Sequence, residues 1–230
     1  MRPQVNRIVI LAMLAVALPA IAGAERVRPG AGRALALRVI RLLARLCGVR
    51  FEIHGADRLD EKCSYVLVPN HTSPIDIPAI LMARPDARFV AAAELFRIPL
   101  LGAAMRALGT TPITRGDRRA AHRQLVTLSR PVVDRELVIF PEGRISQSGD
   151  LGLFRSGAFL VAINSRAPVV PLAIRGTSSV LPPNGRLKLR PGVIRVEILA
   201  PAGTTGLTGI DRKTLAKQVR TDVIDALSAG

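Results

Sequence analysis

A histidine and an aspartate lie five residues apart in the stretch "NHTSPIDIP", residues 70–78, which follows the apolar run "SYVLVP". His71 is one of only three histidines, and it falls where a strand should end and a helix begin, a common place for functional side chains in α/β proteins. A carboxylate at Asp76 that holds one imidazole nitrogen would leave the other free to accept a proton. The pair therefore predicts a general base. The alternative is an aspartate that only caps the helix, beside a histidine in a surface turn.

The sequence offers no convincing nucleophile for this base. It contains no GxSxG stretch, and its two cysteines, Cys47 and Cys63, form neither a CxxC motif nor a metal-ligand spacing. We therefore expect the nucleophile to come from the substrate, as a hydroxyl that His71 deprotonates while it attacks. So few cysteines also indicate reduced thiols in a cytosolic compartment.

A second polar turn ends the apolar run of "ELVIFPEGRIS", residues 136–146. Gly143 allows backbone amides to approach a ligand closely. Beside it, Glu142 could hydrogen-bond a hydroxyl, and Arg144 could pair with a phosphate. The alternative is a turn that merely joins two elements.

Two further stretches carry candidate residues. In "LGTTPITRGDRR", residues 108–119, Arg115 ends a short strand among other arginines. This arrangement suits a phosphate clamp, although a solvated basic face is the alternative. In "APVVPLAIRG", residues 167–176, Pro171 interrupts a β-rich run.

Short β-rich runs alternate with helical stretches from residue 51 onward. The expected strands lie at residues 50–55, 64–69, 88–93, 136–141, 168–176 and 193–199, and the expected helices at about 77–84, 99–108, 117–134, 156–165 and 212–228. This alternation predicts an α/β sheet with helices on its faces. The chain has 230 residues and 49% hydrophobic content, which suits one domain with a sizeable core and an appended segment.

The appended segment is N-terminal. Residues 8–22 carry no charge, and three interpretations compete: a cleaved signal peptide, a transmembrane helix and an interfacial helix. More arginines follow the segment than precede it. Because positive charge accumulates on the cytoplasmic side, this bias favours an anchor whose C-terminal side is cytoplasmic.

Basic residues are concentrated in the same region. Arg38, Arg41 and Arg45 fall on one face of an expected helix, with leucines mainly on the others. A basic amphipathic helix of this kind indicates membrane-surface binding, although a helix that docks on the core with a solvated arginine face fits the pattern equally well. We therefore predict a membrane-binding segment over residues 1–49 and a second domain over residues 50–230.

The net charge of +16 indicates an anionic partner. Nucleic acid, a membrane surface and a phosphorylated substrate all qualify. Aromatic residues make up only 3% of the chain and there is no tryptophan, which disfavours single-strand nucleic-acid binding because that needs stacking rings. Residues 1–50 contribute nine arginines against one acid, Glu25, and this clustering beside an apolar segment favours membrane lipid.

The four polar stretches together resemble the glycerolipid acyltransferase family, meaning 1-acylglycerol-3-phosphate O-acyltransferases and their relatives. The family's first motif, Asn-His, four residues and Asp, matches Asn70, His71 and Asp76, and the second matches Gly109 and Arg115. The third is usually F-P-E-G-T-R-S. This chain has the first four of those residues and then Arg144, Ile145 and Ser146, so the arginine is displaced by one place. The fourth, a Val-Pro strand, matches Val170 and Pro171.

The resemblance implies a mixed central β-sheet flanked by helices and preceded by N-terminal membrane-associated helices. It implies acyl transfer from acyl-CoA or acyl carrier protein to the free hydroxyl of a lysolipid, with His71 as the general base and Asp76 as its orienting partner. Asn70, Arg115, Glu142, Gly143 and Arg144 would bind the acceptor. Neither a metal nor another cofactor is expected.

By the same resemblance, the acceptor would be 1-acyl-sn-glycerol-3-phosphate, which gives phosphatidic acid. The altered third motif keeps a phosphate-free acceptor, such as a lyso-ornithine lipid, open. The expected location is the cytoplasmic face of the inner membrane, with membrane lipid as a partner and no nucleic acid. A non-catalytic basic protein on the same fold, bound to a membrane surface or to nucleic acid, is the alternative from another class.

Overall fold

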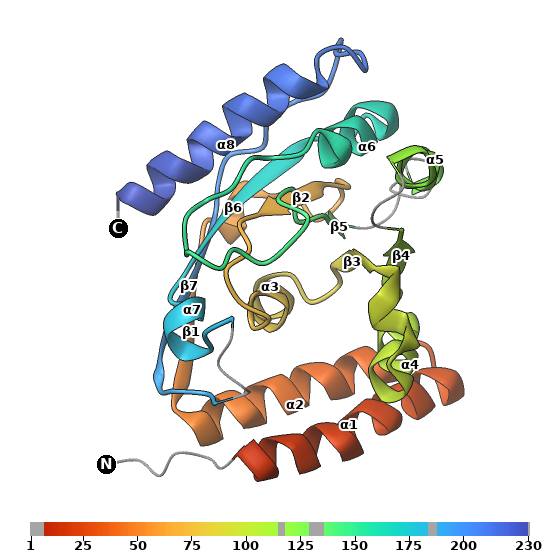
Figure 1. The fold of residues 1–230 in the computed structure, drawn as a ribbon, viewed down its shortest axis with the longest axis vertical. Helices are drawn as coiled ribbons and strands as arrows, with labels where there is room; N and C mark the ends of the chain where they lie inside the picture. Colours follow the sequence, from red (N-terminus) through yellow and green to blue (C-terminus); the bar gives the residue numbers. More distant parts are fainter. Residues whose placement is uncertain (1–6, 115–117, 129–135, 184–187, 230) are drawn as a thin grey trace.

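The structure is a computed structural model that describes residues 7–114, 118–128, 136–183 and 188–229. Its centre is one seven-stranded sheet (Figure 1). In spatial order the strands are β1 (Val49–His54), β7 (Gly192–Ile198), β6 (Val169–Arg175), β2 (Val66–Pro69), β5 (Leu137–Val138), β3 (Arg88–Ala92) and β4 (Thr111–Ile113). Neighbouring strands are parallel, except that β6 and β7 are antiparallel. The prediction of a mixed α/β sheet is confirmed.

Helices cover both faces of this sheet. They are α1 (Arg7–Val27), α2 (Ala31–Cys47), α3 (Asp76–Ala83), α4 (Pro99–Ala107), α5 (Arg118–Leu128), α6 (Gly157–Ser165), α7 (Thr177–Val180) and α8 (Arg212–Ser228), with two short 3₁₀ helices, η1 (Ala56–Arg58) and η2 (Ala93–Arg97). In Figure 1, α6 and α8 lie on one side of the central strands, and α3 lies on the other with the α1–α2 pair beyond it.

The central strands are buried on both faces, so their sequences are continuously apolar. Along β2, Val66 and Val68 belong to the core under α6 and α8, whereas Leu67 belongs to the core under α3. This alternation follows from the two-residue period of a strand. The sheet therefore divides the apolar interior into two layers, and the loops at its edges are the places left for polar chemistry.

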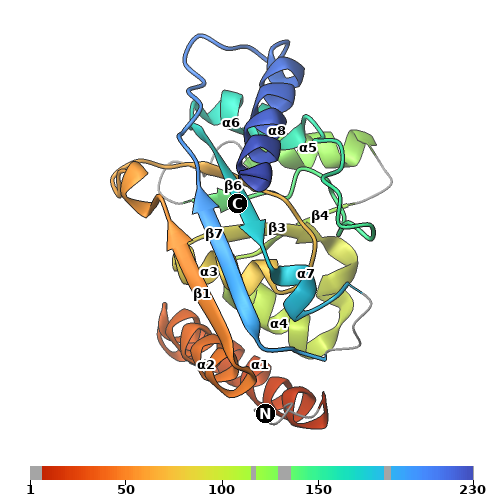
Figure 2. The ribbon, with the colours of Figure 1, turned by 90° about the vertical axis from the view of Figure 1, so that its left-hand side faces the viewer.

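The direction of β1 determines where the N-terminal helices lie. Because β7 is antiparallel to β6, and β1 is parallel to β7, β1 runs against the five parallel strands. Its first residue, Val49, therefore lies at the edge of the sheet where those strands end. Helix α2 stops at Cys47 and so arrives at that edge, as Figure 2 shows.

Helices α1 and α2 pack closely as a hairpin. A Cβ atom on Gly32 of α2 would lie 2.5 Å from the backbone oxygen of Ile21 in α1, so only glycine permits this approach. The carboxylate of Glu25 accepts hydrogen bonds from the backbone N–H groups of Gly30 and Gly32, at 2.9 Å each. These bonds, led by the one from Gly30, lower the pKa of Glu25. They also satisfy backbone donors at the start of α2.

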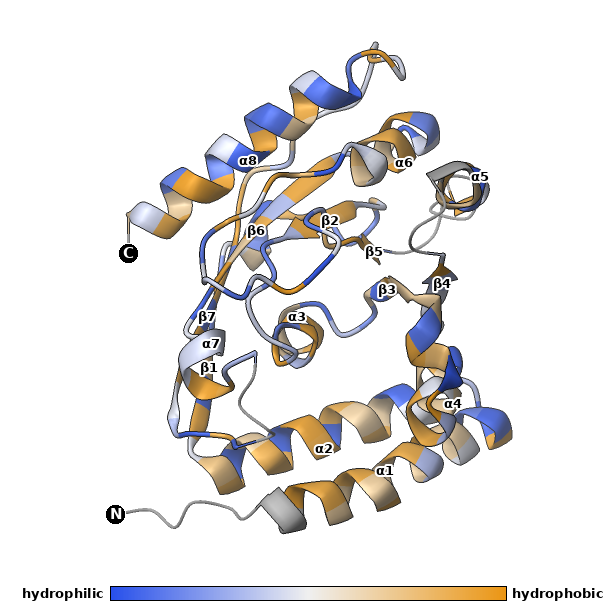
Figure 3. Ribbon diagram, in the orientation of Figure 1, coloured by the Kyte–Doolittle hydropathy of each residue, from blue (hydrophilic) through white to orange (hydrophobic). Residues whose placement is uncertain are grey.

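Helix α1 carries no charge from Ile8 to Ala24, and most of its length is apolar (Figure 3). Ile10, Ala17 and Ile21 are buried against the body of the protein, whereas Leu11 and Val16 on the outer side are 41% and 72% exposed. Residues Ile10–Val27 are long and apolar enough to cross a membrane. An exposed apolar face of this kind marks an interaction surface.

The hairpin is not packed as a separate unit. Ile10 of α1 and Cys47 of α2 belong to the same apolar cluster as Leu67 and Ile80. The division into residues 1–49 and 50–230 stays a prediction, and the packing joins the two segments through one core.

Several elements differ from the sequence-based expectation. Strand β6 runs through Pro171 without interruption, pairing with β2 on one side. Helix α5 is described only as far as Leu128, because the rest of the predicted helix lies outside the described residues. The short helix α7 was not expected. Asp76 is the first residue of α3 and not its cap, because the capping position is Ile75.

Candidate active site

The polar side chains of the first and third motifs meet at the carboxyl edge of the parallel strands. Asn70 and His71 follow β2, and Glu142 and Gly143 follow β5, its hydrogen-bonded neighbour. Parallel neighbours end at the same edge of a sheet, so two loops far apart in the sequence converge there. Their backbones are joined directly, because the N–H of Ser146 donates to the backbone oxygen of His71 at 2.8 Å.

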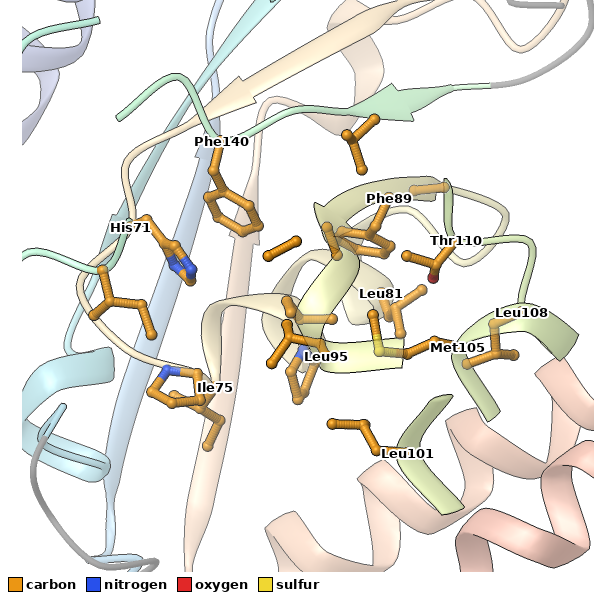
Figure 4. Close-up of a pocket in the computed structure, with 18 of the residues that line it drawn as sticks. His71, Ile75, Leu81, Phe89, Leu95, Leu101, Met105, Leu108, Thr110 and Phe140 are labelled. Carbon is orange, nitrogen blue, oxygen red and sulfur yellow. The ribbon is translucent and has the colours of Figure 1, made fainter. Parts of the chain in front are cut away.

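His71 and Asp76 form the predicted pair. Nδ1 of His71 lies 2.8 Å from Oδ2 of Asp76, and the Asp76 side chain is fully buried. The imidazole also stacks on the ring of Phe140, with 3.8 Å between the ring centroids (Figure 4). With Nδ1 held by the carboxylate, Nε2 is the nitrogen left for a substrate.

The Asp76 carboxylate also shapes the loop that carries His71. Its Oδ2 atom accepts hydrogen bonds from the backbone N–H groups of Thr72 and Ser73, at 2.9 Å each. These donors lie before the helix, so the carboxylate fastens the loop to the start of α3. Asp76 therefore holds both the side chain and the backbone around the candidate base. The alternative that the sequence offered for Asp76 was a helix cap only.

Glu142 supports His71 from the other loop. Its Oε1 accepts the backbone N–H of His71 at 2.8 Å, and its Oε2 accepts that of Gly152 at 3.0 Å. The residue is 7% exposed. Burial raises the pKa of Glu142, and the two backbone hydrogen bonds partly oppose that rise. Both carboxylate oxygens are thus engaged with the backbone, whereas the sequence predicted a hydrogen bond to a substrate hydroxyl.

Asn70 and Ser73 fix the loop to the strand and turn beyond it. The Asn70 side chain donates to the backbone oxygen of Ile174 at 2.9 Å and accepts its N–H at 2.7 Å. The Ser73 hydroxyl donates to the backbone oxygen of Leu181 at 2.6 Å. Asn70 is 2% exposed, so its side chain faces β6, and its predicted contact with a substrate stays a prediction.

His71 faces a large apolar cavity of about 890 Å³. From the histidine the cavity extends past Leu81 and Phe89 toward Leu101, Met105 and Leu108 (Figure 4). The hairpin closes it with residues of both helices, which include Ile10, Leu14, Leu18 and Ile21 of α1 and Ile40, Leu43 and Ala44 of α2. The N-terminal segment therefore forms part of the site.

Two arginines interrupt the apolar lining of this cavity among the residues that the structure describes. Arg33 of α2 is engaged, because its guanidinium donates to the backbone oxygens of Pro85, Ala87 and Leu108 at 2.8–3.0 Å. Arg155 is the other. Its side chain packs beside Gly143, where an added Cβ atom would lie 3.2 Å from Nε and 3.3 Å from Cζ of the arginine.

A second cavity, lined mainly by polar residues, has Glu142 and Gly152 in its wall, and we call it the polar cavity. Arg144 lines this cavity and not the one that contains His71. Gly143, with a φ of +72°, lines the His71 cavity. Arg115 lies outside the described residues. Within those residues, no three histidine, cysteine, aspartate or glutamate side chains come together as a metal site would require.

Sequence reasoning missed Arg155 and the contribution of the N-terminal helices to the cavity. Arg155 follows the third motif by nine residues, and its neighbours in the sequence form no recognisable phosphate-binding pattern. The sequence offered one signal for Arg155, an isolated arginine just before an apolar helix. The cavity walls left no signal, because an apolar residue that lines a cavity has the same character as one in a core.

Comparison with known proteins gives consistent matches. The family described as "Acyltransferase" matches residues 50–175. The 1-acyl-sn-glycerol-3-phosphate acyltransferase beta of Homo sapiens is 32% identical over 168 residues, covering 71% of this chain and 60% of that protein. The chloroplastic enzyme BAT2 of Brassica napus is 36% identical over 160 residues, covering 65% of this chain and 44% of that protein.

Two further matches cover most of this chain. The 1-acyl-sn-glycerol-3-phosphate acyltransferase alpha of Mus musculus is 29% identical over 219 residues, covering 93% of this chain and 74% of that protein. The crystal structure of the 1-acyl-sn-glycerophosphate acyltransferase PlsC from Thermotoga maritima superposes with a TM-score of 0.68 at 26% identity, covering 86% of this chain and 81% of that one.

The chain spans about half the length of its chloroplastic relatives, 44% of BAT2 and 49% of LPAT1 of Arabidopsis thaliana. The matched region nevertheless contains most of β1 and all of β2 to β6, and with them the converging loops that carry His71 and Glu142. Family, fold and motif order thus agree, and the chain belongs to the glycerolipid acyltransferase family.

Proposed function

We propose that this protein transfers a fatty acyl group from an acyl thioester to the free hydroxyl of a lysolipid. The observation that carries the proposal is the His71–Asp76 pair, whose histidine lines a large apolar cavity. The pair supplies a base, and the cavity supplies room for a hydrocarbon chain. The preferred acceptor is 1-acyl-sn-glycerol-3-phosphate, which the names of several relatives specify.

The chemistry needs one proton carrier. Nε2 of His71 takes the proton of the acceptor hydroxyl as the oxygen attacks the thioester carbonyl. The tetrahedral intermediate collapses with cleavage of the C–S bond, and the imidazolium returns the proton to the departing thiolate. The products are the new ester and the free thiol of coenzyme A or acyl carrier protein. The buried Asp76 carboxylate keeps Nδ1 protonated and stabilises the imidazolium that forms transiently.

Asn70 and Glu142 act on this reaction through the backbone. Asn70 ties the end of β2 to β6, and Glu142 holds the N–H of His71. A base misplaced by about 1 Å can cost a hundredfold in rate, so these buried contacts position the histidine. We assign Asn70 and Glu142 to positioning, and Gly143 to the wall beside the acceptor.

The cavity suits an acyl chain because its lining is almost wholly apolar. Each methylene moved from water into such a site contributes about 0.8 kcal/mol. The walls come partly from α1 and α2, whose outer surface combines exposed apolar residues with Arg38, Arg41 and Arg45. We assign the hairpin to the cytoplasmic face of the inner membrane, where its arginines meet anionic lipid and the chain can enter directly.

One feature favours a second acceptor class. Ile145 stands where the family's third motif usually has its arginine, and it lines the His71 cavity. An apolar residue there removes one phosphate ligand and suits an acceptor without phosphate, such as a lyso-ornithine lipid. Assays with both acceptors distinguish a phosphate-containing from a phosphate-free lysolipid.

Purified full-length protein in phospholipid vesicles is assayed with acyl-CoA and, separately, with acylated carrier protein. The acceptors are lysophosphatidate, lyso-ornithine lipid and 1-acylglycerol of one chain length. We expect transfer to lysophosphatidate and a loss of about 10² to 10⁴ in rate for His71→Ala. The variant should keep its fold but melt at a lower temperature, because the ring packs on Phe140 and bonds the buried Asp76 carboxylate. An active His71→Ala variant would refute the base. Transfer to lyso-ornithine lipid alone would replace the acceptor.

A further inference from the structure

Arg155 is placed to recognise the head group of the acceptor. Three arginines, Arg144, Arg155 and Arg212, line the polar cavity among the described residues, and Arg155 is the one that also lines the cavity containing His71. It therefore stands at the boundary between the site of the chemistry and a solvent-open polar space. A lysolipid with its chain in the apolar cavity and its hydroxyl at His71 must direct its head group toward such a boundary.

The guanidinium of Arg155 is available for a ligand. Within the described part of the chain it has no hydrogen-bond acceptor and no ion-pair partner, although the backbone N–H of the residue is tied to the oxygen of Pro141 at 2.9 Å. That bond anchors Arg155 on the turn that carries Glu142 and Gly143. The other arginine of the apolar cavity, Arg33, is bound to three carbonyls and faces the far end near Leu108.

Gly143 makes room for this side chain. Nε and Cζ of Arg155 lie 3.2 and 3.3 Å from the position of a Cβ atom on Gly143. Because Gly143 follows Glu142, whose carboxylate holds the N–H of His71, the guanidinium packs on the same turn that positions the base. Ile145, two residues later, offers no charge. Arg144, between them, lines only the polar cavity, so a cation for the His71 cavity has to come from another part of the chain.

We propose that Arg155 binds the phosphate monoester of a lysophosphatidate acceptor and supplies the cation that Ile145 does not. The inference rests on the proposed acyltransferase function and deepens it, because it names the residue that recognises the acceptor head group. A guanidinium presents parallel N–H donors that match two phosphate oxygens. The phosphates of an acyl-CoA donor or of the carrier protein's pantetheine arm share this chemistry, so the test separates the two sources.

The experiment uses the full chain in vesicles, with wild type, Arg155→Ala, Arg155→Lys and Arg212→Ala. Lysophosphatidate and 1-acylglycerol of the same chain length are varied in turn, and the acyl donor is then varied. We expect Arg155→Ala to raise the KM for lysophosphatidate about tenfold or more. The reaction with 1-acylglycerol and the KM for the donor should stay within about twofold, as should all values for Arg212→Ala. Arg155→Lys should recover part of the loss.

Each other outcome overturns the inference in a distinguishable way. An equal loss with both acceptors would make Arg155 a structural residue, and a change confined to the donor KM would assign the phosphate to the donor. Unchanged kinetics would leave Arg155 as a surface charge, with the proposed function intact. If wild type does not acylate lysophosphatidate, both the acceptor assignment and this inference fail. A second measurement, inhibition by glycerol 3-phosphate, should weaken in Arg155→Ala and remain in Arg212→Ala.

Discussion

Glu142 is the residue through which the two motif loops depend on each other. A buried carboxylate is normally costly unless it is hydrogen-bonded, and here each oxygen accepts a backbone N–H, one from His71 and one from Gly152. The remaining cost of burial is visible as the raised pKa of Glu142. The protein therefore keeps a carboxyl whose charged form is disfavoured by burial next to the proposed base, which is the pattern expected of a functional position.

The raised pKa gives a pH-dependent prediction. The folded protein holds the Glu142 proton to higher pH than the unfolded chain does, so this carboxyl's contribution to stability falls as pH rises through the folded pKa. We expect the free energy of unfolding of wild type, minus that of Glu142→Gln, to decrease as the pH rises above about 4.3, the ordinary pKa of glutamate. Urea unfolding in detergent at several pH values measures it.

Glu52 provides the matched control for this measurement. A side-chain hydrogen bond from Arg195 lowers the pKa of Glu52, so its contribution is present above the unfolded pKa and is lost as pH falls. The wild-type minus Glu52→Gln difference should therefore rise with pH, with most of the rise below about pH 4.3, and should be nearly flat above it. A Glu142 difference with no slope, or with the slope of Glu52, would contradict the burial effect.

How far single residues could be predicted depended on whether they lie in a compact motif. His71 and Asp76 are five positions apart, so one loop fixes their geometry, and the sequence predicted the pair that the structure shows. Arg155 meets Gly143 only because the chain returns to the turn after a loop. Tertiary packing determines this contact, and the spacing of the residues in the sequence does not indicate it.

At the scale of elements, the two helices of the N-terminal hairpin approach each other closely at Gly32. Its neighbour across the interface is the backbone of Ile21, which cannot move aside as a flexible side chain can. We expect Gly32→Ala to force the helices apart and to cost about 1–3 kcal/mol of stability. Thermal melting of the full chain in detergent micelles measures the change.

Gly23 is the control on the partner helix. A Cβ atom there would meet nothing within 4 Å, so Gly23→Ala should be neutral or stabilise α1 by about 0.5–1 kcal/mol through helix propensity. If both substitutions changed the melting temperature equally, close packing at Gly32 would not be the reason.

The strand and helix positions were largely predictable from apolar periodicity, because both faces of the sheet are covered and each run is strongly apolar. The positions of the N-terminal helices relative to the site were not. They depend on the reversal between β6 and β7, a feature of pairing between strands that are separated in the sequence. No local pattern in residues 31–47 indicates that this helix forms a wall of the cavity.

At the scale of the whole molecule, exposed cations occur at both ends. Arg38 and Arg41 lie on α2, and Lys213 and Lys217 lie on α8 at the opposite end (Figure 1). Of these two helices, α2 is the one that packs against α1, which carries the exposed apolar residues. A basic residue near an anionic bilayer contributes about 1 kcal/mol to binding. The position of the basic residues should therefore affect membrane binding more than their total number does.

Vesicle flotation tests this asymmetry. We expect the double variant Arg38→Gln, Arg41→Gln to lose about thirtyfold in binding to anionic vesicles, and Lys213→Gln, Lys217→Gln to bind nearly as wild type does. On neutral vesicles the two variants should behave alike. Equal losses on anionic vesicles would mean that the overall charge, and not the hairpin, attracts the protein.

The shared wall between hairpin and cavity has a kinetic consequence. In the proposed arrangement, one side of the chain-binding space is built from helices that rest in the bilayer, so an acceptor would reach His71 by sliding sideways out of a leaflet without desorbing into water. The acceptor concentration that determines the rate is then its density within the membrane surface. Saturation should follow the mole fraction of lysolipid among the surrounding lipids, so that adding inert phospholipid slows turnover, while diluting the same vesicles with buffer leaves the rate per bound enzyme unchanged.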